Sequence, residues 1–170
     1  VRVDLADDVE IDFKKLERHF YTTSSCGVCG KSSIEALATN APKIENDNFS
    51  IASELIHELP KKLIENQSVF EQTGGLHASA LFDKIGNLEI VCEDVGRHNA
   101  LDKIIGAKFL KNETPLNDKI LLLSGRISFE LVQKALMAGI SIIVAVGSPS
   151  SLAVKLAEEF NITLVGFVRE

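Results

Sequence analysis

Three apolar runs alternate with two amphipathic segments in residues 119–167, KILLLSGRISFELVQKALMAGISIIVAVGSPSSLAVKLAEEFNITLVGF. The apolar runs show no alternation of polar and apolar side chains, which is typical of strands buried on both faces of a sheet. The amphipathic segments between them suit helices that cover such a sheet. The expected strands are 119–123, 140–146 and 162–167, and the expected helices are 128–138 and 150–160.

A β-hairpin precedes this stretch. The apolar runs 76–82 and 88–92 flank the sequence DKIGN at 83–87, which is typical of a turn between antiparallel strands. A helix is expected over 99–110. An antiparallel hairpin followed by strand–helix–strand–helix–strand units predicts an α/β fold, a three-layer α/β/α sandwich around a mixed sheet.

Before the hairpin, the sequence predicts a short strand at 1–5, a short helix at 32–37 and a longer helix over 51–67. Apolar residues in the longer helix recur at helical spacing. Pro60 interrupts them and should kink or split the helix, because proline has no amide hydrogen to donate.

Length and composition indicate one globular domain. The chain has 170 residues, 45% of them hydrophobic and 25% charged. The formal net charge of -6 argues against a broad basic surface for nucleic acid, but it is compatible with a local basic pocket for a phosphate-bearing molecule. No apolar run approaches the roughly 20 residues of a membrane-spanning helix, and no secretory signal is visible. We expect a cytoplasmic protein without nucleic-acid or membrane partners, and, because Val1 replaces an initiator Met, a fragment or trimmed chain.

Two of the three cysteines are separated by two residues, in the sequence TTSSCGVCGK at 22–31. Such a pair can form a disulfide, share a metal ion, or provide one nucleophilic sulfur and a second that resolves the product. A helix that begins near Ser32 and the charge of Lys31 would both lower a thiol pKa below its usual value of about 8.5. Cys26 and Cys29 are therefore the candidate reactive residues.

Half of a zinc site is the alternative interpretation of this pair. A closed zinc site needs about four ligands, and the others would have to come from Cys92, His77 or His98, which are scattered along the chain. The sequence holds no second CxxC motif. We therefore expect no bound metal.

The sequence TGGLHA at 73–78 opens the first hairpin strand. Gly74 and Gly75 would let the backbone approach a ligand closely, and His77 begins the strand. A tight loop with a hydrogen-bonded core histidine explains the same residues, so both interpretations stay open.

The sequence EDVGRHNALDK begins at Glu93, ends one strand and opens a helix. Ligands of α/β sheets bind where strands end in this way. Capping of the helix by Asp94 or Asn99, and pairing of Glu93 with Arg97, would explain some of these polar side chains. With His98 included, the turn holds more polar groups than capping requires, which favours a function.

Two further strands are followed in the same way by a loop and a helix. SGRIS at 124–128 combines Gly125 and Arg126 with two serines, and GSPSS at 147–151 occupies the equivalent place after the next strand. Backbone amides at a helix start, together with glycine and arginine, form a ready anion site. Three such loops at one sheet edge predict a ligand that carries a phosphate or a nucleotide.

Five sequence runs together resemble those of the FdhD/NarQ family of formate dehydrogenase accessory sulfurtransferases. They are SSCGVCGK, FEQTGGLHASALF, EDVGRHNALDKIIG, SGRISFELVQKA and the closing TLVGFVRE. The resemblance implies a cytidine-deaminase-like α/β/α fold. It also implies one domain at 1–170, with a lead-in at 1–20, a motif-bearing core at 21–170 and the family's further N-terminal region absent.

The same resemblance implies a function. Proteins of this family accept persulfide sulfur from a cysteine desulfurase and deliver it to the bis(molybdopterin guanine dinucleotide) molybdenum cofactor, which makes formate dehydrogenase active. Cys26 matches the persulfide-bearing cysteine of the family, and Cys29 matches its second cysteine. A homodimer is the default expectation for the family.

The motifs and the resemblance together predict that the molybdenum cofactor, or a guanine nucleotide, binds at the strand ends. The last four residues match the start of a cofactor-binding segment of the family, which is cut short here. The candidate cofactor-binding residues are Gly74, Gly75, His77, Arg97, His98, Asn99, Ser124, Gly125, Arg126, Ser128, Phe167, Val168, Arg169 and Glu170.

A zinc deaminase and a cofactor chaperone are the rival functions. Zinc deaminases carry H-x-E followed by P-C-x-x-C, whereas here Ala78 and Ser79 follow His77, and the CxxC motif comes before it. The sequence thus argues against deaminase chemistry. A protein that only binds the molybdenum cofactor would need the anion loops but not the thiolates.

Overall fold

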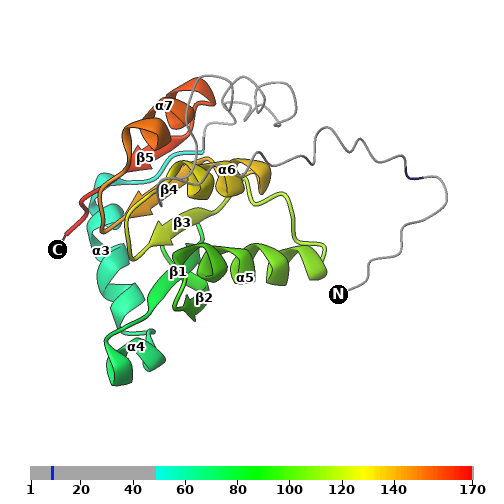
Figure 1. The fold of residues 1–170 in the computed structure, drawn as a ribbon. Helices are drawn as coiled ribbons and strands as arrows, with labels where there is room; N and C mark the ends of the chain where they lie inside the picture. The colour runs from blue at the N-terminus through cyan, green and yellow to red at the C-terminus, as the bar shows by residue number, and fades with distance from the viewer. Residues whose placement is uncertain (1–8, 10–48, 170) are drawn as a thin grey trace, which may run out of the picture.

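The computed structural model describes residue 9 and residues 49–169, and the longer stretch forms a five-stranded sheet with helices packed on it (Figure 1). The predicted strand at 1–5 and helix at 32–37 lie outside the described residues. In chain order the elements are α3 (Ser53–Ile64), α4 (Ser68–Thr73), β1 (His77–Phe82), β2 (Leu88–Asp94), α5 (Arg97–Leu110), β3 (Ile120–Leu123), α6 (Phe129–Met137), β4 (Ile142–Ala145), α7 (Ser151–Glu159) and β5 (Thr163–Val165).

The sheet is mixed, as predicted. Its strands are ordered β2-β1-β3-β4-β5. β1 is antiparallel to both β2 and β3, whereas β3, β4 and β5 run parallel. Ala80, in the middle of β1, lies between Val91 of β2 and Leu122 of β3. In consequence, the start of β1 and the ends of β2, β3 and β4 all lie at the same end of the strands. This end of the sheet is called the near edge below, and the opposite end of the strands is called the far edge.

Two hydrophobic clusters, one on each face of the sheet, form the core. On one face, Leu121 and Ile143 pack with apolar residues of α5, α6 and α7. On the other face, Leu122 and Val144 pack with Leu59 of α3. Successive strand residues point to opposite faces, which explains why the central strands β3 and β4 are apolar throughout. The predicted α/β/α sandwich is confirmed (Figure 1).

The helix predicted over 51–67 is shorter than expected and is not split. α3 continues through Pro60, which is itself buried. Proline removes one helical hydrogen bond, but Leu59 and Leu63 on the same helix are completely buried against the sheet. Tertiary packing of an apolar face contributes more to helix stability than local propensity does.

The short helix α4 was not predicted. The backbone N–H groups of Val69 and Phe70, in its first turn, donate to the carboxylate of Glu93 at 3.0 and 2.8 Å. Glu93 is 24 residues beyond Val69 in the chain, so no local pattern in the sequence could reveal it.

The other predicted elements are present, with ends that shift by one or a few residues. α5 begins at Arg97 rather than at residue 99, and β5 spans Thr163–Val165 rather than 162–167. None of the helices in the described part of the chain is both long and apolar enough to cross a membrane.

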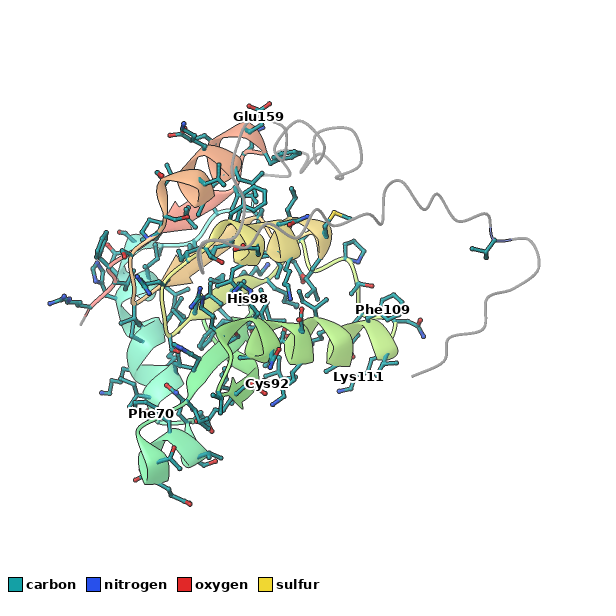
Figure 2. All side chains as sticks on the ribbon, in the orientation of Figure 1. Phe70, Cys92, His98, Phe109, Lys111 and Glu159 are labelled. Atoms are coloured by element: carbon teal, nitrogen blue, oxygen red, sulfur yellow. The ribbon has the colours of Figure 1, made fainter. Side chains whose placement is uncertain are left out.

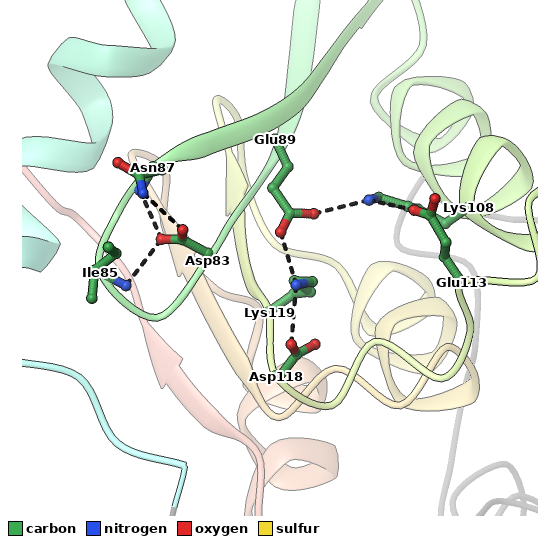
Figure 3. A network of polar contacts seen from close by, with 8 residues as sticks. All are labelled: Asp83, Ile85, Asn87, Glu89, Lys108, Glu113, Asp118 and Lys119. Atoms are coloured by element: carbon green, nitrogen blue, oxygen red, sulfur yellow. Dashed lines mark hydrogen bonds and ion pairs between the residues drawn. The ribbon is translucent and has the colours of Figure 1, made fainter.

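A network of charged residues joins three elements at the far edge of the sheet (Figure 3). Glu89, near the start of β2, pairs with Lys108 of α5 at 2.9 Å and with Lys119, just before β3, at 2.8 Å. Lys108 also pairs with Glu113 at 2.8 Å. The network ties the end of α5 and the residue before β3 to β2, the outermost strand of the sheet.

The hairpin turn at the same far edge depends on one aspartate. Asp83 Oδ1 accepts hydrogen bonds from the backbone N–H groups of Ile85 at 3.0 Å and Asn87 at 2.9 Å (Figure 3). Its Oδ2 accepts from the side-chain amide of Asn87 at 2.9 Å. The predicted turn chemistry is confirmed.

Candidate functional site

The loops after β2, β3 and β4 meet at the near edge of the sheet. His77, the first residue of β1, is opposite Asp94, the last residue of β2. Ser124, just after β3, donates its backbone N–H to the carbonyl of Ala78 at 3.0 Å. Its Oγ accepts from the N–H of Ala78 at 2.8 Å. Ser124 therefore anchors the loop after β3 to β1.

The loops after β3 and β4 are joined through their backbones. The N–H of Ile127 donates to the carbonyl of Ser148 at 3.0 Å, and the N–H of Ser150 donates to the carbonyl of Ile127 at 2.9 Å. Gly147 permits this approach, because a Cβ atom at that position would lie 2.6 Å from the backbone nitrogen of Arg126.

A pocket of about 150 Å³ lies between these two loops and the start of α5. α5, α6 and α7 all begin there, and free backbone amides and the helix dipole favour anions at helix N-termini. The volume is below the roughly 300–1,000 Å³ of sites that hold a whole ligand, so the pocket suits one group, such as a phosphate or diphosphate. Its lining residues are Arg97, Arg126, Ile127, Ser128, Ser148, Pro149 and Ser150.

Two of these side chains have a buried polar atom that makes no hydrogen bond within the described residues. Ser128 is 7% exposed, and its Oγ has no partner. The Nε atom of Arg97 also lacks one. A buried donor without a partner costs about 1–3 kcal/mol, and oxygen atoms of an anion would remove that cost. Arg126, which is exposed, supplies a second guanidinium group.

A larger hollow of about 520 Å³ lies at the far edge of the sheet, next to the β1–β2 turn. Asp83 and Asp118 line it, with Lys84 as its one cation among the lining residues. None of its described lining residues belongs to a helix, so this hollow suits an anion less well than the smaller pocket does.

Asp94 organises the turn between β2 and α5. Its Oδ1 accepts from the backbone N–H of Gly96 at 2.9 Å and from the side-chain amide of Asn99 at 3.0 Å. Its Oδ2 pairs with Lys103 at 2.6 Å. The hydrogen bond from Lys103, followed by those from Gly96 and Asn99, lowers the pKa of Asp94 to about 2. The prediction that Asp94 or Asn99 caps α5 is wrong, because the N-cap residue is Gly96 and no side chain caps it.

The predicted pairing of Glu93 with Arg97 is also wrong. No ion pair joins the two among residues 49–169, and the Glu93 carboxylate accepts instead from the backbone of α4. Two directed N–H donors at a helix start hold a carboxylate as well as a guanidinium does. Arg97 is consequently left to line the pocket.

Neither candidate histidine lines the pocket. His98 is half-buried at the N-terminal end of α5 (Figure 2). Burial, and then the charge of Arg97, lower the pKa of His98 below its ordinary value, so the ring is mostly neutral at neutral pH. His77 packs against the loop after β3, where a Cβ atom on Gly125 would lie 3.0 Å from its Nδ1.

The other candidates on β1 and β2 have structural explanations. Gly74 ends α4 in the left-handed conformation, with φ of 65°, which favours glycine without any ligand. Cys92 is half-buried on β2, and burial raises the pKa of its thiol. Within residue 9 and residues 49–169, no three His, Cys, Asp or Glu side chains are arranged to hold a metal ion.

The C-terminal segment lies beside the loop after β4. The N–H of Phe167 donates to the carbonyl of Gly147 at 3.2 Å, while Val168 is buried in the core. Phe167 is 64% exposed and has φ of 60°, an uncommon conformation for an aromatic residue. The ring of His57 donates from Nδ1 to the carbonyl of Arg169 at 3.0 Å.

The model of the FdhD/NarQ family matches residues 1–170, the whole of the chain. This chain belongs to the FdhD/NarQ family. It is 52% identical over 171 residues to the sulfur carrier protein FdhD of Streptomyces coelicolor, a match that covers 99% of this chain and 61% of that protein. It is 50% identical over 153 residues to the sulfur carrier protein FdhD of Picrophilus torridus, covering 90% of this chain and 58% of that protein. The chain thus spans about three fifths of the length of the curated relatives that it matches.

A crystal structure from Desulfotalea psychrophila is similar to this FdhD/NarQ chain with a TM-score of 0.61 and 34% identity. The match covers 66% of this chain and 48% of that protein, which is assigned as a formate dehydrogenase accessory protein.

In this FdhD/NarQ chain, three of the predicted site residues, Arg97, Arg126 and Ser128, come together in one pocket. Two other predicted residues, Ser124 and Asn99, hold the neighbouring loops through hydrogen bonds to Ala78 and Asp94. Cys26, Cys29 and Glu170 lie outside the described residues. Ser148 and Ser150 also line the pocket. They belong to the loop 147–151, which was predicted to bind an anion, but their side chains were not named among the candidate residues.

Proposed function

We propose that this chain is the core of a sulfur carrier that matures formate dehydrogenase. It accepts persulfide sulfur from a cysteine desulfurase on Cys26 and passes the sulfur to the bis(molybdopterin guanine dinucleotide) molybdenum cofactor, which is its substrate. The observation that carries the proposal is about 50% identity, over nearly the whole chain, to proteins named sulfur carrier protein FdhD.

The chemistry that we propose for the thiols needs two steps. The Cys26 thiolate attacks the terminal sulfur of the desulfurase persulfide, the S–S bond of the donor breaks, and the desulfurase cysteine leaves as a thiolate. Attack by the Cys29 thiolate on the Cys26 sulfur then releases hydrosulfide and leaves a disulfide between Cys26 and Cys29. The two electrons that reduce the transferred sulfur come from the two thiolates, and a dithiol reductant restores them.

The pocket at the near edge supports the nucleotide part of this proposal. The molybdenum cofactor carries guanosine through a diphosphate, and diphosphate is a small, highly charged group. Arg97 and Arg126 present guanidinium groups that can bind phosphate oxygens in pairs. Ser128 contributes a buried hydroxyl group that has no hydrogen-bond partner among the described residues. The two guanidinium groups act on a bound group from within the Debye length of about 8 Å, whereas charges elsewhere on the surface are screened.

A chaperone that only binds the molybdenum cofactor is the second candidate, because the pocket by itself would serve it equally well. Incubation of the chain with a cysteine desulfurase and cysteine separates the two. In the Cys29→Ser form, which cannot release the sulfur as hydrosulfide, a sulfur carrier gains the mass of one sulfur atom on the peptide that contains Cys26, whereas Cys26→Ser gains none. A chaperone gains no sulfur in either form.

A further inference from the structure

The turn that leads into α5 is clamped from two directions. Asp94 Oδ1 accepts from the N–H of Gly96 and from the amide of Asn99, as described above. Lys103 reaches back from the next turns of α5 to Asp94 Oδ2, and its Nζ also donates to the carbonyl of Glu93 at 3.0 Å. The first turns of α5 are thereby tied to the last two residues of β2.

This turn has little freedom to adopt another shape. A Cβ atom on Gly96 would lie 3.2 Å from the side-chain nitrogen of Asn99, so the amide packs directly on the backbone. Asp94 is 19% exposed, and its lowered pKa of about 2 keeps it ionised at neutral pH. The residue that follows Gly96 is Arg97, the first residue of α5.

Arg97 depends on this turn for its place in the pocket. No ion pair or hydrogen bond holds its Nε within the described residues. The direction in which the Arg97 side chain leaves the helix therefore depends on the backbone conformation of Arg97, and the turn before α5 fixes that conformation. We propose that Asp94 is a positioning residue, whose hydrogen bonds to Gly96 and Asn99 hold Arg97 in the anion pocket. The inference rests on the proposed function of that pocket and concerns how its affinity arises.

The sign of one mutational effect distinguishes positioning from simple electrostatics. Asp94 carries a negative charge next to a site for anions, so removal of the charge alone would strengthen anion binding. Removal of a positioning contact weakens it, because Arg97 must then be ordered when the ligand binds.

The hairpin at the far edge provides a matched control. Asp83 accepts from two backbone N–H groups and from the amide of Asn87, as Asp94 does from Gly96 and Asn99. Asp83→Ala thus removes the same kind of turn contact at the opposite edge of the sheet, away from the pocket.

The test is titration of the chain with inorganic pyrophosphate by calorimetry. We expect Asp94→Ala to weaken binding by about fivefold to tenfold, and Asp83→Ala to change it by less than about twofold. We expect Asp94→Asn, which keeps the acceptor oxygen and loses the charge, to bind at least as tightly as the wild type. In an Arg97→Ala background, Asp94→Ala should cause no further loss, because the two residues act in series.

Three results would overturn the inference. They are unchanged or tighter binding by Asp94→Ala, weaker binding by Asp94→Asn, and additive effects of Asp94→Ala and Arg97→Ala. If Asp94→Ala does not fold, Asp94→Asn still decides the matter through its sign. Failure of wild type to bind pyrophosphate would overturn both the anion pocket and the positioning role, whereas the sulfur transfer to Cys26 is tested independently by the mass of the persulfide.

Discussion

The backbone N–H of Ile127 donates to the carbonyl oxygen of Ser148 at 3.0 Å, and this bond joins the loops that follow β3 and β4. The pocket exists because these loops touch. Gly147 allows the contact, since any side chain there would collide with the backbone of the first loop.

We therefore expect Gly147→Ala to destabilise the protein by about 1–3 kcal/mol, as overpacking does, and to weaken pyrophosphate binding. Urea unfolding measures the first effect. Gly106→Ala is the control, because no atom of the described residues lies within 4 Å of a Cβ there and the site is inside α5. It should stabilise the protein by about 0.5–1 kcal/mol. Equal stability of Gly147→Ala and wild type would contradict the described packing.

Loss of one pocket arginine should weaken nucleotide binding. We expect Arg126→Ala to raise the dissociation constant for guanosine diphosphate by about tenfold or more, because each charge-assisted hydrogen bond contributes about 1.5–3 kcal/mol. Lys111→Ala makes the same change of charge at the other end of α5 (Figure 2) and should have little effect. Calorimetric titration gives both values, and equal affinity of Arg126→Ala and wild type would remove Arg126 from the site.

How much of the local structure can be predicted from the sequence depends on whether the residues that bond to one another are close together in the chain. The hairpin turn at Asp83 was predictable, since the residues that bond to it follow within four positions. α4 was not predictable, because its N-terminal amides bond to Glu93 on β2. The same long-range bond explains why the predicted pair of Glu93 and Arg97 is wrong.

The pocket could be predicted in outline, because loops that follow parallel strands meet at one edge of a sheet. Which side chains enter it could not be predicted. Arg97 and Ser128 line the pocket, whereas Asn99 turns back to bond to Asp94. That choice depends on the conformation of a single turn, and the pattern of residue types does not specify it.

Acid should weaken the charged network at the far edge. Burial alone would raise the pKa of Glu89, but hydrogen bonds from Lys108 and Lys119 outweigh it, and the pKa is lowered. A lowered folded-state pKa gives stability that is complete above the unfolded pKa of about 4.3 and is lost as the pH falls through the folded value. We expect Glu89→Gln to lower the free energy of unfolding at pH 7 by about 1–3 kcal/mol.

Urea unfolding between pH 7 and pH 3 checks this expectation, and the difference between wild type and Glu89→Gln should shrink as the pH falls below about 4.3, where the carboxylate of the unfolded chain is half protonated. A difference that stays constant over this range would show that the charge of Glu89 contributes nothing.

The chain should hold no stoichiometric zinc. Two thiols without a second pair of ligands rarely complete a tetrahedral site. Elemental analysis of protein purified without added metal measures the zinc content. About one zinc per chain that disappears in Cys26→Ser and Cys29→Ser would establish the metal site instead.

Maturation of formate dehydrogenase tests the central claim most directly, because the proposed sulfur transfer requires the Cys26 thiolate and not only the fold. The measurement is formate dehydrogenase activity in cells that lack their own FdhD/NarQ protein and receive this chain as wild type, Cys26→Ser or Cys92→Ser. Cys92 is half-buried with a raised pKa, so its replacement controls for the loss of a thiol. We predict activity with wild type and Cys92→Ser and none with Cys26→Ser, whereas wild-type activity with Cys26→Ser would contradict the persulfide on Cys26.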